Sequence, residues 1–259
     1  MRLHTSEAIL LDVRDLQDRD RIVTFFTREQ GKKRGVAQGA RTRHSRFGGQ
    51  LQPLAKVSVT WFEKEGRDLV RLSAVELIRP AHRLFEDLDG ILLGSYLADH
   101  LLEFSPDAEP NDPLYRLLDV ATEALLGGAD RDLVARYFET WVLRLAGIFP
   151  APNECPECGR PLAELGARLP RQGDALLCPD CAAGRGSLSV SRDAVALLLG
   201  FHRHSLAQLG SVAGGGAEAW AETLREIEGL CGEVRRGFLG RELRTYEVMQ
   251  QTRLGSGVR

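Results

Sequence analysis

Four of the five cysteines form two CxxC pairs, Cys155 with Cys158 and Cys178 with Cys181, separated by 19 residues. Two residues between thiolates allow one chain reversal to turn both sulfurs toward the same ion, and two such reversals complete a tetrahedron. Four sulfur ligands leave no coordination position for water or substrate. The spacing therefore predicts one structural zinc ion rather than a catalytic one.

The same four cysteines have two other interpretations, as reduced thiols without a metal or as ligands of an iron–sulfur cluster. The paired spacing and the short intervening segment favour a small tetrahedral ion. Zinc sites of this kind occur in proteins of many functions, so the metal leaves the function open. Cys231 lies elsewhere, on a stripe of apolar residues at steps of three and four, and is predicted to be a core residue.

A second chemical feature is the positive charge between residues 28 and 46, where Glu29 is the only acid. Such a patch neutralises phosphates independently of base sequence and in a salt-dependent way. Phe47 and Trp61 are candidates for stacking on unpaired bases. An ordinary solvated basic surface is the alternative. The candidate nucleic-acid contacts are Arg28, Lys32, Lys33, Arg34, Arg41, Arg43, His44 and Arg46.

The charge is distributed unevenly along the 259 residues. The total is -2, yet residues 1–80 contain 16 Lys and Arg against 10 Asp and Glu. No apolar run approaches the roughly 18–20 residues of a membrane span, and the first residues lack the layout of a secretory signal. Paired cysteines suit a reducing compartment. We expect a cytoplasmic protein without a membrane partner, whose contacts with polyanions concentrate near its amino terminus.

Several catalytic motifs are absent from the sequence. GxxxxGK[ST], HExxH, GxSxG and GxGxxG do not occur, so nothing indicates nucleotide hydrolysis or a hydrolase. His202 and His204 near a helix end, and the charge-balanced segment 14–21, are interpreted as solvated surface. We expect no enzymatic activity and no bound nucleotide.

The first 80 residues have the pattern of a small β-barrel. Alternating apolar residues between turns predict five short strands, over residues 8–13, 22–26, 32–37, 57–62, and 69–72 with 75–78. Five strands in this length are typical of an OB-fold. An SH3-like barrel or a small sandwich would give much the same pattern.

From Pro80 onward the apolar period changes to three and four, which predicts amphipathic helices. The expected fold is α+β and multidomain, with an N-terminal OB-fold barrel and a helical C-terminal domain that carries an inserted four-cysteine zinc knuckle. The expected parts are an OB-fold domain (1–80), a helical domain (81–150), the zinc region (151–188), C-terminal helices (189–250) and a disordered tail (251–259).

The order and spacing of several segments resemble the RecO family of bacterial recombination mediators. Residues 31–41, GKKRGVAQGAR, carry the most specific part of the likeness. Gln38 departs from the family pattern, in which lysine is frequent, and residues after Gly210 match least. The other segments that carry the likeness are residues 6–10, 20–27, 45–53, 138–139, 143–147 and 239–245.

This resemblance implies a protein that binds single- and double-stranded DNA and anneals complementary strands without ATP. It implies that residues 1–80 are a DNA-binding domain and that the C-terminal helices pack on the helical domain. It also implies action with RecR and the tail of single-strand-binding protein to load recombinase, at the bacterial nucleoid. Some family members lack the cysteines, whereas this chain has all four, so zinc is assigned here. Two other functions stay open, an RNA-binding OB-fold and zinc-ribbon factor and a protein-interaction scaffold.

Overall fold

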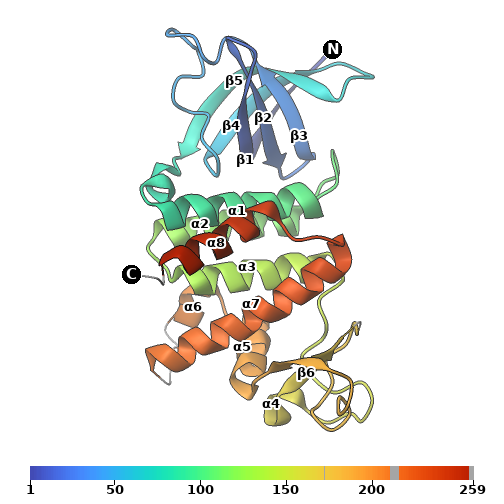
Figure 1. Ribbon diagram of the computed structural model, residues 1–259. Coiled ribbons are helices and arrows are strands. Elements are labelled where there is room, and N and C mark those ends of the chain that lie inside the picture. Colours follow the sequence, from blue (N-terminus) through green and yellow to red (C-terminus); the bar gives the residue numbers. More distant parts are fainter. Residues whose placement is uncertain (172, 211–215, 257–259) are drawn as a thin grey trace. The chain divides into compact units, whose positions relative to one another are not determined.

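The computed structural model describes residues 1–171, 173–210 and 216–256. Its first five strands form a closed barrel in the order β1-β2-β3-β5-β4 (Figure 1). Neighbouring strands are antiparallel except β3 and β5, which are parallel. This is the OB-fold arrangement, so the predicted barrel is confirmed. The strands are β1 (Arg2–Leu16), β2 (Asp20–Thr27), β3 (Gly31–Ala37), β4 (Lys56–Glu63) and β5 (Leu69–Arg79).

Alternation of buried and outward residues along the strands builds the barrel core. In β4, Val57, Val59 and Trp61 are fully buried, and the Trp61 ring meets the Phe25 ring edge-on at 5.5 Å. Gly35 lies where β5 crosses β3, and a Cβ atom there would be 2.9 Å from the Val70 side chain. Each fully buried large apolar side chain stabilises the barrel by about 1.5–3 kcal/mol.

The connection between β3 and β4, residues 38–55, packs on the barrel and contributes buried apolar residues to its core. Its backbone makes successive short turns, with Thr42 N donating to Gly39 O at 3.1 Å and Ser45 N to Thr42 O at 3.0 Å. Phe47 is fully buried in the barrel core cluster. The connection is therefore anchored by the Phe47 ring, while residues 41–44 and Arg46 are exposed.

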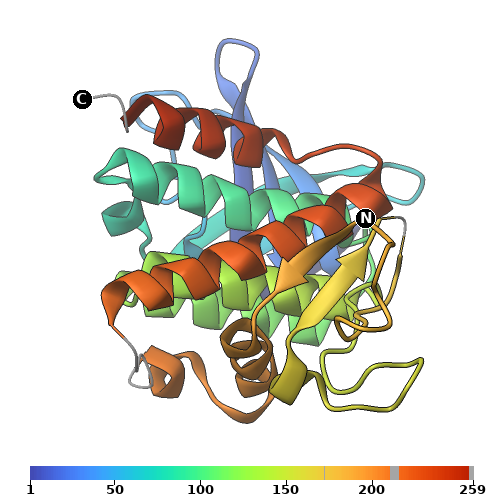
Figure 2. The same ribbon diagram turned by 60° about the horizontal axis from the view of Figure 1, so that its bottom comes forward.

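Helices α1 (Leu88–Phe104), α2 (Asp112–Leu126) and α8 (Arg244–Ser256) group with the barrel. A short 3-10 helix, η1 (His82–Phe85), follows β5. The Asp87 carboxylate caps α1 by accepting from Gly90 N. Tyr115 of α2 stacks on Phe26 of β2 with ring centroids 6.4 Å apart. Figure 2 shows α8 beside α1, where Thr245 Oγ1 donates to Asp99 at 2.8 Å.

The predicted tail is partly corrected by α8. Residues 251–256, expected to be disordered, continue that helix, while 257–259 lie outside the described residues. Helix α8 is held by tertiary contacts, since Leu243 and Met249 are buried and the Tyr246 ring lies 5.7 Å from Tyr96. Packing of this kind determines helicity more than local propensity does.

A second compact unit comprises Gly127–Glu242. Asp130 caps α3 by accepting from the amides of Asp132 and Leu133, as its position predicts. The helices expected after the zinc region begin with two short ones, because α5 ends at Arg203 and α6 begins at Leu206. The elements are α3 (Arg131–Leu145), α4 (Leu162–Leu165), β6 (Ala167–Pro170), β7 (Ser187–Val190), α5 (Arg192–Arg203), α6 (Leu206–Gly210) and α7 (Ala217–Leu239).

A buried ionic cluster joins α3 to α7 in this unit. Arg136 contacts Glu139 and Glu228, each at 2.8 Å, and its side chain is 1% exposed. Removing one member of such a cluster leaves an uncompensated buried charge. Cys231 is also fully buried, 3.6 Å from Thr140 Oγ1. Burial raises the pKa of the Cys231 thiol to about 12, as expected for a core residue.

The two units run across the predicted domain boundaries, because α1, α2 and α8 group with the barrel, whereas α3 and α7 group with the cysteine region. The inserted cysteine region itself is observed, between α3 and α5. None of the described helices combines the length and apolar character needed to cross a membrane.

Candidate functional site

The four predicted cysteines come together in the second unit. Their Sγ atoms all lie within 4.8 Å of one another, and none forms a disulfide. The Sγ atoms of Cys158 and Cys178 are 3.7 Å apart. A tetrahedral zinc ion with Zn–S bonds of about 2.3 Å would place its sulfurs about 3.8 Å apart. This donor set therefore fits a tetrahedral metal ion.

Two tight turns present these sulfurs. In the first, Gly159 N donates to Cys155 O at 2.7 Å and Cys155 N donates to Arg160 O at 2.9 Å. Gly159 has φ of 73°, a conformation that glycine adopts without steric cost. In the second, Ala182 N donates to Cys178 O at 3.0 Å. The chain reversals predicted from the CxxC spacing are thus observed.

Arg160 adds positive charge beside the sulfurs. Its Nε donates to Cys158 Sγ at 3.4 Å and its Nη2 to Cys178 Sγ at 3.1 Å. The hydrogen bond from Arg160 is the main reason that the pKa of Cys158 is lowered to about 6, which favours the thiolate that binds metal. Hydrogen bonding with the Cys178 and Cys158 sulfurs instead raises the pKa of Cys181. Sulfurs this close cannot all ionise without a cation among them.

Seven of the eight predicted basic residues fall into two groups. The first contacts acidic residues in the connection between α1 and α2 and at the start of α2. Arg28 pairs with Asp112. Asp107 lies 3.3 Å from both Lys32 and Arg34. Lys32 also donates to Leu102 O at 2.7 Å, and its side chain is only 11% exposed. These cations already have carboxylate or carbonyl partners within the same unit.

The backbone of this acidic connection, residues 105–111, docks directly on β3. Asp107 forms a parallel bridge with Lys32, and Ala108 N donates to Lys32 O at 2.8 Å. A Cβ atom at Gly31 would lie 1.9 Å from Glu109 O, so this approach requires glycine. No sequence pattern indicated that an acidic segment would lie over the basic strand.

Lys33 points to a different partner. Its Nζ lies 2.8 Å from Glu63 Oε1, and its side chain is 11% exposed. Glu63 also approaches His4 Nε2 at 3.3 Å. The hydrogen bond from Lys33 holds the pKa of Glu63 below its usual value, although desolvation of the carboxyl opposes this. Lys33 is thus largely enclosed by the barrel.

The second basic group is the exposed loop 41–46, with Arg41, Arg43, His44 and Arg46. Arg41 Nη1 donates to Gln17 O at 2.9 Å, and its Nε lies 3.4 Å from Asp15. Arg46 donates to Leu72 O at 3.2 Å and lies over the Phe47 ring at 4.9 Å. The loop therefore presents four basic side chains to solvent.

The prediction that Phe47 and Trp61 stack on bases is wrong. Both side chains are fully buried in the barrel core. Phe47 anchors the loop, and Trp61 shares the inward face of β4 with Val57 and Val59. The sequence contained a signal for the burial of Trp61. Alternate residues of a strand point to the same face, so residue 61 shares the face of the apolar residues 57 and 59.

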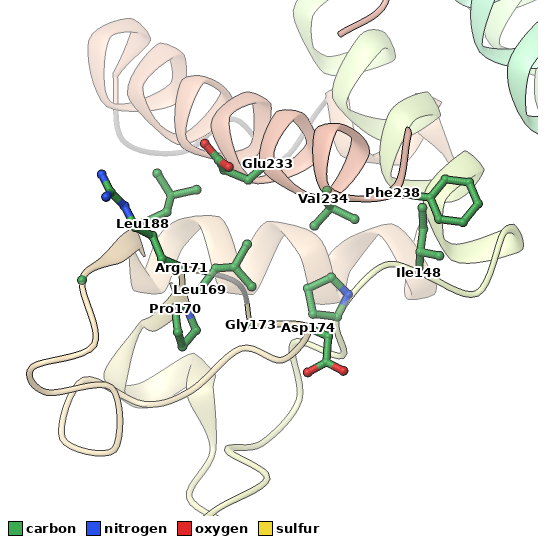
Figure 3. A pocket seen from close by; sticks show the side chains of 13 residues that line it. Ile148, Leu169, Pro170, Arg171, Gly173, Asp174, Leu188, Glu233, Val234 and Phe238 are labelled. Carbon is green, nitrogen blue, oxygen red and sulfur yellow. The ribbon is translucent and has the colours of Figure 1, made fainter. Parts of the chain in front are cut away.

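A groove of about 840 Å³ lies between α7 and the β6–β7 hairpin of the second unit. Figure 3 shows Ile148 and Phe238 at one end and Leu188 and Arg171 at the other. Phe238 is 58% exposed. The charged lining residues are Arg171, Asp174 and Glu233. One cation against two acids gives an acidic peptide no net attraction to this groove.

Comparison with known proteins assigns the family. A model described as "Recombination protein O N terminal" matches residues 1–81, which are the barrel. A second, "Recombination protein O C terminal", matches residues 85–247, which contain the four cysteines. The chain belongs to the RecO family. It is a RecO-family DNA repair protein, and the resemblance read from residues 31–41 and the other segments is confirmed.

Three relatives, each named "DNA repair protein RecO", show the extent of the similarity. The protein of Anaeromyxobacter sp. (strain K) is 36% identical over 176 residues, 68% of this chain and 69% of its own. That of Geobacter metallireducens is 35% identical over 193 residues, 74% of this chain and 78% of its own. That of Desulforamulus reducens is 29% identical over 262 residues, 99% of both chains. Similarity to RecO proteins thus extends over both units.

Proposed function

We propose that this RecO-family chain binds single- and double-stranded DNA and anneals complementary strands without a nucleotide. The observation that carries the proposal is loop 41–46, whose four basic side chains are exposed on an OB-fold barrel. Lys and Arg side chains bind phosphates by releasing condensed counterions. Two strands held on such a loop repel each other less, and base pairing then supplies the free energy of annealing.

The two basic groups take different parts in this mechanism. Loop 41–46 makes the first phosphate contacts. Arg28, Lys32 and Arg34 bind phosphates after exchanging their carboxylate partners for them. Lys33 is largely enclosed and contributes mainly to the positive electrostatic potential around the barrel. The protein forms and breaks no covalent bond, so it acts as a mediator rather than as an enzyme.

We further propose that the four cysteines hold one zinc ion with a structural role. The donor set is entirely sulfur, and four protein ligands leave no open position. When bound, zinc cross-links the two turns and fixes the hairpin of β6 and β7. Arg160 orients and partly neutralises the sulfurs through its hydrogen bonds to Cys158 and Cys178.

Membership of the RecO family supports RecR and the tail of single-strand-binding protein as partners, at the nucleoid in the cytoplasm. In this proposal the chain, together with RecR, helps recombinase to replace single-strand-binding protein. Pull-down of each purified partner by this chain tests the assignment, and absence of both contacts would contradict it.

Annealing of two complementary labelled strands at several salt concentrations, without ATP, tests the central proposal. The double variant Arg41→Glu/Arg43→Glu should slow annealing and weaken strand binding. Loss of two phosphate contacts should also reduce the slope of log affinity against log salt by about 1.4 for single strands. Arg192→Glu/Arg203→Glu, at two exposed arginines of the second unit, is the charge-matched control.

Unchanged affinity of the double variant would contradict the role of the loop. Absence of strand binding by the unmodified chain at low salt would contradict the proposed function itself. RNA of the same sequence serves as a competitor, and preference for RNA would favour the RNA-binding alternative.

A further inference from the structure

We propose that Phe62, between Leu3 and Arg71 on the outer face of the barrel, stacks on unpaired bases and gives this chain a preference for single strands over duplexes. The inference rests on the proposed nucleic-acid binding and adds a residue and a selectivity to it. Phe62 takes the role that Phe47 and Trp61 cannot take, because both are buried.

The strand register places these residues in one row across the barrel. Leu3 pairs with Phe62, Phe62 with Arg71, and Arg71 with Val36. Residues directly opposite one another point to the same face of a sheet, with Cβ atoms about 4.5–5.5 Å apart. The neighbours of Phe62 and Arg71 along their strands include Trp61 and Leu72, which point inward. The row is therefore on the outside.

Phe62 is the one phenylalanine or tryptophan of residues 1–80 that reaches solvent. The structure describes this whole segment, and the rings of Phe25, Phe26, Phe47 and Trp61 are all fully buried. Its apolar neighbourhood is also exposed, since Leu3 is 60% and Leu69 is 41% exposed. A half-buried ring that reaches solvent amid exposed apolar side chains provides a surface on which a base can stack.

Positive charge flanks this apolar surface. Arg71 is exposed, and it forms no ion pair with any of the described residues. Arg46 donates to the carbonyl of Leu72, the next residue along β5, so loop 41–46 continues into the row. Arg34 pairs in register with Leu69. Phosphates on either side of a stacked base would thus meet guanidinium groups, the combination that binds single strands.

The acidic side chains near the row are already paired or balanced. Glu63, which follows Phe62, contacts Lys33 and His4. The turn between β4 and β5 carries Glu65 and Asp68 together with Lys64 and Arg67, so its net charge is zero.

Stacking on Phe62 requires a base that is free of its partner, because duplex bases are enclosed in the helix. Loop 41–46 contacts phosphates in both forms, whereas Phe62 contacts only single strands. The ratio of the two affinities should therefore depend on this ring.

Two substitutions and a dT oligonucleotide test the inference in the full chain. Phe62→Leu keeps the apolar volume and removes the ring. It should weaken dT binding about 5–20-fold at fixed salt, leave the salt slope unchanged, and leave duplex affinity unchanged. Arg71→Gln is the complementary variant and should lower the salt slope by about 0.7. An unchanged melting temperature confirms that each variant is folded.

Phe62→Trp gives a direct readout of stacking. Its additional fluorescence, after subtraction of the unmodified chain, should be quenched by dT but not by duplex or by an abasic strand. If labelled dT binds while neither the quenching nor the Phe62→Leu effect occurs, the inference is overturned and the proposed function stands. If the unmodified chain binds no strand at low salt, both are overturned.

Discussion

The carboxylate of Asp107 lies 3.3 Å from the Nζ of Lys32, and the backbones of the two residues form a β-bridge at the same point. An acidic segment is thereby held on the basic strand by main-chain pairing as well as by charge. The other carboxylate oxygen of Asp107 lies 3.3 Å from the Nη2 atom of Arg34. Asp107 occupies the position that a phosphate would take between these two cations.

Neutralising Asp107 should strengthen nucleic-acid binding. In Asp107→Asn, Lys32 and Arg34 lose their carboxylate partner while the main-chain bridge persists. We expect tighter binding of single strands, by about threefold to tenfold at low salt, and a steeper salt dependence. Fluorescence anisotropy with a labelled strand over a salt series measures both quantities.

Glu109→Gln is the matched control for this experiment. Glu109 is an exposed acid of the same connection, and its substitution removes the same charge at a residue whose side chain pairs with no described cation. An equal gain in affinity from both variants would show a general charge effect and contradict a specific role of Asp107.

Removal of the metal should destabilise the second unit. Chelation, or Cys178→Ser, removes the cross-link between the two turns, and four-cysteine sites of this type derive much of their folding free energy from the ion. We expect about one zinc per chain by elemental analysis, and a lower melting temperature after chelation.

Cys231→Ala is the control for the cysteine substitution. Cys231 is buried beside Thr140 and does not belong to the cluster of four cysteines. This variant should therefore lose some packing free energy and keep its zinc. A chain with no zinc, or a melting temperature unaffected by chelation, would contradict the structural role of the metal.

Acid should weaken the barrel through Glu63. The folded pKa of this carboxyl is lowered, chiefly by the hydrogen bond from Lys33, so the folded state binds fewer protons than the unfolded state. The stabilisation is therefore complete above the unfolded pKa of about 4.3 and is lost as the pH falls through the lower folded pKa.

The Glu63→Gln variant isolates this effect. The Glu63 side chain is 32% exposed, so solvent screening limits its contribution to about 1 kcal/mol or less. The difference in unfolding free energy between the variant and the unmodified chain should shrink between pH 6 and pH 3 in urea titrations. A constant difference across that range would show that the Lys33 pair contributes nothing.

Local patterns predicted the cysteine cluster and the barrel better than they predicted the basic surface. The cysteine turns depend on residues three positions apart, and the strands depend on alternation over a few residues, so both are visible in sequence. The partners of Lys32 and Arg34 come from Asp107, about 75 residues further along the chain. Such a pairing depends on how α1 and α2 pack on the barrel, and the spacing of neighbouring residues in the sequence does not indicate that packing.

Two errors have identifiable physical reasons. Phe47 was expected on the surface because it lies in a charged loop, but its ring packs among the apolar residues of the barrel core. Residues 251–256 lack a strong apolar period, and contacts of α8 with α1 at Tyr246 and Thr245 stabilise the helix instead. The outward position of Phe62 could have been predicted, because it follows Trp61 in a strand whose residues Val57, Val59 and Trp61 point inward.

The first compact unit is assembled from two stretches of chain, Met1–Leu126 and the segment that begins at Leu243. During synthesis the ribosome completes the barrel, α1 and α2 first, and the whole cysteine-bearing unit follows before α8 emerges. Until then the face of α1 around Tyr96 lacks the Tyr246 ring that packs against it. This contact of the first unit is therefore completed only after the whole second unit has been synthesised.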